Sequence, residues 1–282
     1  MRKRLRRTLA EALFKDLSKV YNSFDIVGDI AIIKLPPSAT ENEAKIIAKT
    51  IMSIHKNVKT VLLQASPVAG DFRLRRLIHV AGENKTSTIH REFGCLFMVD
   101  LVKCYFSPRL SHERTRIATL VKPNEAVINM FAGVGCFSII IAKHSKAAKV
   151  FSIDVNAAAV QLMQENVRLN RVYDKVIPLL GDAQEIIKSR LQQVADRVLM
   201  PLPEKSLTYL PYAISALKAS GGWIHYYGFE HATKAENPAE KTRLKIVNTL
   251  DSLGINFEVP FVRVVRSTGP NWFQLAADIY IT

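Results

Sequence analysis

Cysteine is scarce in this sequence, and no two cysteines form a C-x-x-C pair. Cys95, Cys104 and Cys136 each lie in an apolar stretch. Structural zinc sites and disulfide frameworks are built from closely spaced cysteines, so both classes are excluded here. We expect three reduced, buried thiols, no bound metal ion and a cytoplasmic location.

Long hydrophobic runs are also absent. No apolar stretch approaches the length that crosses a membrane, and the basic N-terminus lacks the apolar core of a secretory signal. The sequence shows no internal repeat. These absences exclude membrane-spanning, secreted and repeat architectures, and they leave the oligomeric state open.

Acidic residues are outnumbered, since 25 aspartates and glutamates face 39 lysines and arginines, for a formal net charge of +14. A solvated basic surface is one interpretation. The sharper one is a polyanionic partner, of which RNA and DNA are the commonest. The chain has 282 residues, 48% of them hydrophobic, enough for one large domain or two modest ones.

A glycine-containing turn follows the apolar run at 126–128 and precedes an apolar segment that starts a helix. Gly133 and Gly135 would let the backbone approach a ligand, towards which the helix also points its first amides. An ordinary tight turn is the alternative. Ile139 stands near the place of the third glycine of the dinucleotide fingerprint. This favours a nucleoside without phosphates, such as S-adenosylmethionine.

Two further strands end in an aspartate. Asp154 follows the strand at 149–153, about twenty residues beyond the glycines, where nucleoside-binding folds place a carboxylate for the ribose hydroxyls. Asp182 follows the strand at 175–180 and would accept from an adenine amino group or a backbone amide. A helix N-cap is the alternative for a single aspartate in this position.

The order of elements predicts an α/β fold. From residue 126 onward, strands alternate with helices, which is typical of a doubly wound, mostly parallel sheet, with a closing hairpin at one edge. The expected strands are 126–128, 149–153, 175–180, 197–200, 222–227, 257–265 and 273–281. The expected helices are 157–170, 183–192, 206–218 and 238–252.

The first half of the chain reads differently. Residues 1–21 predict a basic amphipathic helix, and residues 22–104 predict a small α+β domain with a basic strand at 72–81 that places Arg73 and Arg75 on one face. A connector then leads into the domain at 105–282, through a helix at 110–120 that carries Glu113. A glutamate on a helix is usually solvated, but active sites collect between domains.

Six blocks of the sequence carry a family likeness. They are FDIVGDIAIIKLP, TIHREFGCLFMVD, YFSPRLSHERTR, MFAGVGCFS, ADRVLMPLP and GGWIHYY, in this order. From about residue 22 onward, the chain resembles the archaeal and eukaryotic tRNA (guanine-37-N1)-methyltransferases. A sister group in wyosine biosynthesis transfers an aminocarboxypropyl group from the same cofactor and differs at the FSPRL block.

The resemblance implies a Rossmann-like class I methyltransferase domain that uses S-adenosyl-L-methionine, and a small preceding domain that helps to hold the tRNA anticodon stem-loop. It assigns Glu113 as general base, Arg73 as the arginine at the target guanine, and Tyr105 as a tyrosine that shapes the site. The positions that it matches to the cofactor are Phe131, Gly133, Gly135, Arg114, Asp154, Asp182 and Pro201.

The chain departs from the family pattern in three places. Asn129 stands where the first strand of the methyltransferase domain usually ends in aspartate, and Pro201 stands where asparagine is usual. Proline offers neither a side-chain amide nor a backbone N–H, so one polar contact to the target base or the methionine end is lost. About twenty residues precede the shared region, too few for the additional N-terminal domain of many relatives.

The chemistry follows from the target atom. N1 of guanine carries a proton at neutral pH, so its methylation needs a base, and Glu113 suits this task if partial burial raises its pKa. Arg73 would stabilise negative charge on O6. Two other functions stay open: wyosine-pathway chemistry at position 37, by carbon methylation of the tricyclic intermediate or by aminocarboxypropyl transfer, and RNA binding without catalysis.

Overall fold

The computed structural model describes residues 24–36 and 38–282, so the helix predicted at 1–21 lies outside the described residues. The chain divides into two compact units, Met1–Arg109 and Leu110–Thr282. Each unit has its own sheet.

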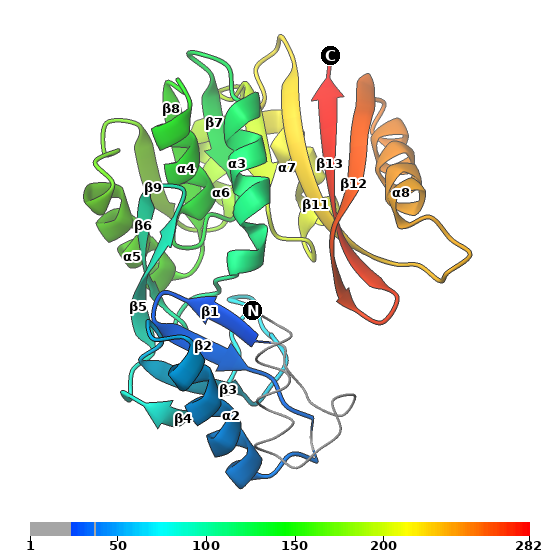
Figure 1. Cartoon of the computed structure of the whole chain (residues 1–282). Helices are drawn as coiled ribbons and strands as arrows, with labels where there is room; N and C mark the ends of the chain where they lie inside the picture. The colour runs from blue at the N-terminus through cyan, green and yellow to red at the C-terminus, as the bar shows by residue number, and fades with distance from the viewer. Residues whose placement is uncertain (1–23, 37) are drawn as a thin grey trace. The chain divides into compact units, whose positions relative to one another are not determined.

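The described part of the first unit is a four-stranded sheet with one helix packed on it and a separate hairpin (Figure 1). The turn at Gly28 has a positive φ of 56° and joins two antiparallel strands. The sheet order is β1 (Phe24–Val27), β2 (Ile30–Ile33), β3 (Thr60–Gln64) and β4 (Leu77–Gly82). The helix is α2 (Glu41–Ile54), and the hairpin is β5 (Ser87–Glu92) with β6 (Cys95–Asp100).

The predicted strand at 72–81 is wrong in its first half. Arg73 has φ 54°, its backbone N–H donates to the Gly70 carbonyl at 3.0 Å, and β4 begins only at Leu77. The glycine at position 70 closes a tight turn ahead of the strand, because it adopts a φ of 72° at no steric cost. The alternation that would place Arg73 and Arg75 on one strand face therefore does not apply.

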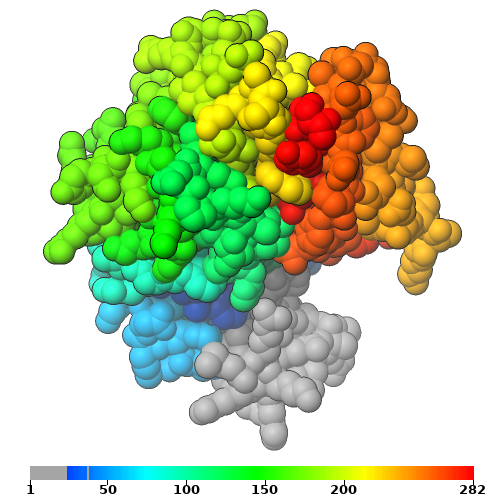
Figure 2. Space-filling view, turned by 90° about the horizontal axis from the view of Figure 1, so that it is seen from above, coloured from blue at the N-terminus to red at the C-terminus, as the bar shows by residue number. Residues whose placement is uncertain are grey.

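The second unit is a seven-stranded sheet between two layers of helices. Five parallel strands are followed by a hairpin whose last strand pairs antiparallel with β11, so the predicted edge hairpin is confirmed. The strands do not lie in the sheet in the order in which they follow along the chain. In Figure 2 the last strand of the chain, in red, lies between the yellow and orange segments that precede it. The sheet order is β12 (Phe257–Gly269), β13 (Trp272–Ile281), β11 (Gly222–His231), β10 (Arg197–Met200), β7 (Ala126–Asn129), β8 (Lys149–Asp154) and β9 (Val176–Leu180).

Helices cover both faces of this sheet. The short 3-10 helix η2 (Pro108–Leu110) spans the boundary between the units and leads into α3. One layer contains α3 (Ser111–Leu120), α4 (Cys136–His144) and α5 (Ala157–Leu169). The other contains α6 (Ala183–Ile186), the π-helix η3 (Ile187–Leu191), α7 (Ser206–Ala216) and α8 (Pro238–Ser252). The helix predicted at 183–192 thus widens to π geometry in its second half, which buries both Ile187 and Leu191.

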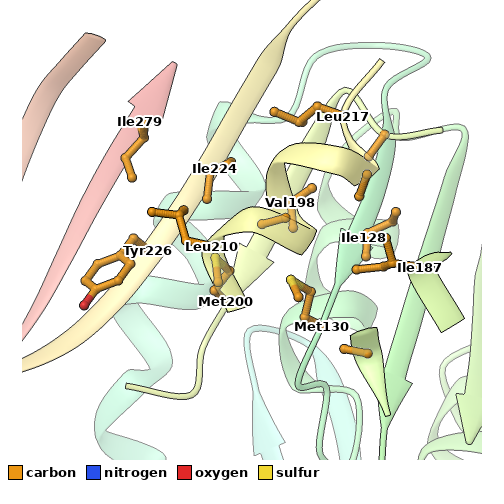
Figure 3. Close-up of a cluster of buried hydrophobic side chains, with 14 of the residues drawn as sticks. Ile128, Met130, Ile187, Val198, Met200, Leu210, Leu217, Ile224, Tyr226 and Ile279 are labelled. Atoms are coloured by element: carbon orange, nitrogen blue, oxygen red, sulfur yellow. The ribbon is translucent and has the colours of Figure 1, made fainter. Parts of the chain in front are cut away.

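An apolar core lies between the sheet and the second helix layer. Ile128, Val198 and Ile224 come from neighbouring strands, and Leu210 comes from the helix that covers them (Figure 3). All four side chains are fully buried, and burial of each contributes roughly 1.5–3 kcal/mol. This core fixes the parallel strands so that their carboxyl ends meet at one edge, where α/β folds bind ligands.

All three cysteines are buried and form no disulfide. In the described part of the chain, no helix is both long and apolar enough to cross a membrane.

Candidate functional site

The glycine turn lies directly beyond β7, at the point where strand order reverses between β7 and β10. Gly133 and Gly135 have φ values of 56° and 91°, and Gly135 is the N-cap residue of α4. The backbone N–H of Gly133 donates to Asp154 Oδ2 at 2.7 Å. The turn therefore joins the ends of β7 and β8 into one rigid edge.

Gly135 is required by both conformation and space. A Cβ at this position would lie 2.9 Å from Met163 Cγ and 3.2 Å from Ile139 Cδ1. We expect Gly135→Ala to lower the thermal midpoint by more than Gly254→Ala, whose added Cβ meets nothing within 4 Å. At both positions the alanine has to adopt a left-handed backbone conformation, which costs about 1–2 kcal/mol. A difference between the two melting temperatures therefore isolates the cost of the close packing at Gly135. Equal midpoints would contradict the close approach.

Asp154 lies at the end of β8 with both carboxylate oxygens oriented by the backbone. Oδ2 accepts from Gly133, and Oδ1 accepts from the N–H of Asn156 at 2.9 Å. Burial raises the pKa of Asp154, although these two backbone donors act in the opposite direction. A carboxylate held in this way has lone pairs left that can accept from further donors.

Asp182 is the N-cap of α6, as the alternative interpretation of the sequence held. Its Oδ1 accepts from Gln184 N at 2.7 Å, and its Oδ2 accepts from the Tyr209 hydroxyl at 2.6 Å. Tyr209 in turn packs edge-on against Phe131, with ring centroids 5.2 Å apart. Asp182 and Phe131 are thus brought together through a tyrosine of α7.

The two departures from the family pattern have different structural effects. Asn129 is fully buried, and its side-chain amide donates to Ser138 Oγ at 3.1 Å. This hydrogen bond joins the end of β7 to the first turn of α4, on either side of the glycine turn. Pro201 directly follows β10. The backbone carbonyls on either side of it, those of Met200 and Leu202, accept from Ser206 Oγ.

The edge fits a nucleoside that carries no phosphate. Two apolar side chains at this edge are exposed. Val155, which directly follows β8, is 47% exposed, and Leu180, the last residue of β9, is 57% exposed. An adenine ring would find apolar flanks there, next to a carboxylate for ribose and a glycine turn that permits close approach. These residues suit S-adenosylmethionine. No group of three or more His, Cys, Asp or Glu side chains in the described residues is arranged to hold a metal ion.

Glu113 lies in the first turn of α3 and is 1% exposed. Its Oε1 accepts from Arg116 Nε at 2.8 Å and from the Tyr227 hydroxyl at 3.0 Å. Its Oε2 accepts from Nη2 of Arg263 on β12. In the described part of the chain, the donors to this carboxylate all come from the second unit.

The direction of the Glu113 pKa shift is opposite to the expectation. Burial raises the pKa, but hydrogen bonds and charges from Arg116 and Arg263 outweigh it and hold the pKa below its ordinary value of 4.5. Arg263 lies 150 residues further along the chain, so its contact could not be anticipated from the helix alone.

A buried series of charges continues behind Glu113. Arg116 binds both oxygens of Asp278, at 2.6 and 3.0 Å, and Asp278 Oδ1 lies 2.6 Å from His225 Nδ1. Arg197 Nη1 lies 2.6 Å from His225 Nε2 and continues to Glu125. A guanidinium only donates, so His225 accepts at Nε2 and donates from Nδ1 to Asp278. Burial lowers the pKa of His225, which is therefore neutral.

Two contacts connect Glu113 to the glycine turn. Tyr227, which donates to Glu113, packs against Phe137 in the first turn of α4, with ring centroids 5.8 Å apart. Arg114 is buried, and its guanidinium carbon lies 5.9 Å from the same Phe137 ring. Glu113 and the glycine turn are therefore separated by one layer of aromatic side chains.

Arg73 and Tyr105 belong to the first unit. The Arg73 guanidinium carbon lies 4.4 Å from the centroid of the Tyr105 ring, so these two predicted residues meet. Their roles at the target base stay predictions.

Sequence reasoning missed the residues that hold Glu113. Arg116 was detectable, since charged side chains three residues apart on a helix are neighbours. A charged residue inside an apolar strand is a second signal, and Asp278 in QLAADIYI is an example. The residues missed, which surround Glu113 directly or through Asp278, are Arg116, His225, Tyr227, Arg263 and Asp278.

Comparison with known proteins gives a consistent result along the chain. Residues 88–251 match the TRM5/TYW2 methyltransferase domain, and residues 1–86 match the TYW2 N-terminal domain. The tRNA (guanine(37)-N(1))-methyltransferase Trm5b of Pyrococcus abyssi is 42% identical over 92% of this chain and 75% of its own length. The tRNA 4-demethylwyosine(37)-methyltransferase Taw21 of Saccharolobus solfataricus is 36% identical over 97% of this chain and 98% of its own.

Two solved structures resemble this chain over nearly its full length. The complex of aTrm5 with tRNALeu has a TM-score of 0.85 at 34% identity and covers 99% of this chain and 78% of that one. Methanocaldococcus jannaschii TYW2 in complex with AdoMet has a TM-score of 0.65 at 28% identity and covers 92% of this chain and 99% of that one.

Proposed function

The chain belongs to the TRM5/TYW2 methyltransferase family, and from that premise we propose that it methylates N1 of guanosine-37 in the tRNA anticodon loop with S-adenosyl-L-methionine. The observation that carries the proposal is a buried carboxylate, Glu113, one aromatic layer from the glycine turn. The net charge of +14 supports a polyanionic substrate.

Glu113 takes the N1 proton in this reaction. The cofactor supplies a methyl group on a sulfonium, which is already activated, so the task of the protein is orientation. N1 attacks the methyl carbon, the electron pair of the C–S bond returns to sulfur, and the N1 proton passes to Glu113 Oε2. Arg116 and Tyr227 keep Oε1 fixed throughout. The family likeness supports Arg73 as the donor to O6 and Tyr105 as its stacking partner.

Phe131, Gly133, Gly135, Arg114, Asp154, Asp182 and Pro201 are proposed to surround the cofactor. Asp154 would accept from the ribose hydroxyls, and the glycine turn would admit the methionine end.

Asp154 gives the sharpest test of that arrangement. We expect Asp154→Asn to weaken cofactor binding by about 10- to 100-fold, the range for losing hydrogen bonds to a charged group. An asparagine amide also turns a donor towards either Gly133 N–H or Asn156 N–H. Calorimetric titration with S-adenosylmethionine measures the change, with exposed Asp174→Asn as control. Unchanged affinity in the Asp154 variant would remove this residue from the cofactor site.

The function itself is tested with labelled cofactor and tRNA transcripts that carry G or A at position 37. We expect label only in the G37 transcript, and a nucleoside heavier by one methyl group. Equal labelling of both transcripts, or no labelling of either, would overturn the proposal.

Carbon methylation of a wyosine intermediate at the same position is the second candidate. The Taw21 relative favours it, because that match spans 97% of this chain and 98% of the relative, and Pro201 removes a polar contact at the target pocket. A tRNA that carries 4-demethylwyosine distinguishes the two, since only this candidate would add a methyl group to it. Addition of an aminocarboxypropyl mass would instead indicate the chemistry of the sister enzymes.

The buried thiols of Cys95, Cys104 and Cys136 support a cytoplasmic location. Residues 22–104 are proposed to position the RNA, and residues 105–282 to perform the transfer.

A further inference from the structure

The two oxygens of Glu113 accept hydrogen bonds from donors that differ in number and in exposure. Oε1 accepts from Arg116 and Tyr227, which lie on the buried side of the carboxylate. Oε2 accepts from Arg263, whose side chain is 41% exposed, against 19% for Arg116. Oε2 is therefore the oxygen that a substrate can reach, and Arg263 covers it.

This arrangement conflicts with the work of a base. A guanidinium stays protonated at any relevant pH, so Arg263 cannot pass a proton on or accept one. Oε2 keeps a second lone pair, but Glu113 is 1% exposed and Arg263 contacts this oxygen, so the N1–H of a guanine has no open approach to it. Of the donors to Glu113 in the described residues, one has to move aside before the proton can be taken.

Only Arg263 is free to move. Arg116 is held by both oxygens of Asp278, and Tyr227 is 1% exposed. Within the described residues, the carboxylate of Glu113 is the one acidic partner of Arg263, and the buried Nε of Arg263 has no hydrogen-bond partner. An unsatisfied buried donor costs about 1–3 kcal/mol, so the covering position is not an optimal one for this side chain.

We propose that Arg263 is a removable cap on Glu113, which the target base displaces when it takes its place at Oε2. The proposal rests on the proposed function and identifies Arg263 as a positioning residue that acts through Glu113. The RNA itself offers phosphates, to which a displaced guanidinium can bind.

Removal of the cap also adjusts the strength of the base. The groups that face Glu113 are Arg116 from α3, Tyr227 from β11 and Arg263 from β12, with Asp278 of β13 behind Arg116. When Arg263 leaves, one of two cations is lost while burial remains, so the pKa of Glu113 rises. A strong base thus forms only in the presence of substrate.

The pH dependence of methylation tests the cap. On the acid side of the pH profile, the fall in kcat/KM (its acid limb) reports the pKa of the base in the free enzyme, and the fall in kcat reports the pKa of the base in the complex. In wild type, we expect the acid limb of kcat/KM to lie at lower pH than the acid limb of kcat. In Arg263→Met, the kcat/KM limb should move up by about 1 unit or more to meet the kcat limb, while kcat at pH 8 changes by less than about threefold.

Arg266→Met on the same strand is the matched control and should leave the two limbs separate, and Arg263→Lys should restore part of the separation. Coincident limbs in wild type would overturn the cap, as would a fall in kcat of more than tenfold in Arg263→Met. Failure of the proposed function is recognised independently, because wild type would then methylate no G37 transcript.

Discussion

Glu113→Gln is expected to lower the single-turnover methylation rate by about 10²-fold or more, the range for loss of a general base. Glutamine matches the shape of glutamate and still accepts from Arg116 and Tyr227 through its one oxygen. It cannot take the N1 proton, because its amide is not basic. The rate is measured at saturating cofactor and tRNA, so that binding does not contribute.

Glu240→Gln provides the control for this variant. Glu240 also lies in the first turn of a helix, but α8 covers the far end of the sheet and the side chain is exposed. Its rate should equal that of wild type. If Glu113→Gln binds cofactor normally and retains a rate within about threefold of wild type, Glu113 is not the base.

Asp278→Asn is expected to destabilise the second unit by about 3–5 kcal/mol, because it breaks a buried ion pair and leaves the partners in place. Arg116 would retain one carboxylate instead of two, and His225 would lose its charged acceptor. Urea unfolding at pH 7 measures the change, with exposed Asp251→Asn as control. A loss below about 1 kcal/mol would show that the buried series contributes little to stability.

The same carboxylate makes stability dependent on pH. Burial raises the pKa of Asp278, but hydrogen bonds from His225 and Arg116, together with the charge of Arg116, hold it well below its ordinary value of 3.8. The unfolded chain therefore binds the proton more strongly. The contribution is present above pH 3.8 and is lost as the pH falls towards the lower native pKa. The asparagine variant should show a shallower decline of stability in that range.

The elements proposed to position the cofactor were predictable, because each rests on a local pattern. Glycines after a short apolar strand predicted the turn, and alternating strands and helices predicted the parallel sheet. Asp154 could be placed from its distance in sequence to the glycines. These signals need no knowledge of which segments pair.

The surroundings of Glu113 were not predictable in this way. The positions of Arg263 and Asp278 depend on the register of β12 and β13, where Phe261 pairs with Asp278 and Arg263 with Ala276. Strand periodicity gives two faces but no partner, so Arg116, three residues from Glu113 on the same helix, could be anticipated and Arg263 could not. Arg73 shows the opposite error, since three arginines in a short stretch were read as a strand and a glycine turn interrupts it.

Residues from opposite ends of the second unit meet at the buried carboxylates. Arg116 and Asp278 are separated by 162 residues, and β13 enters the sheet between two strands that precede it in the chain. We expect no smaller fragment of the unit to assemble the surroundings of Glu113, because Asp278 lies on β13, the last strand of the chain to join the sheet. Refolding from urea should therefore restore activity and structure in a single cooperative step, without a half-folded active form.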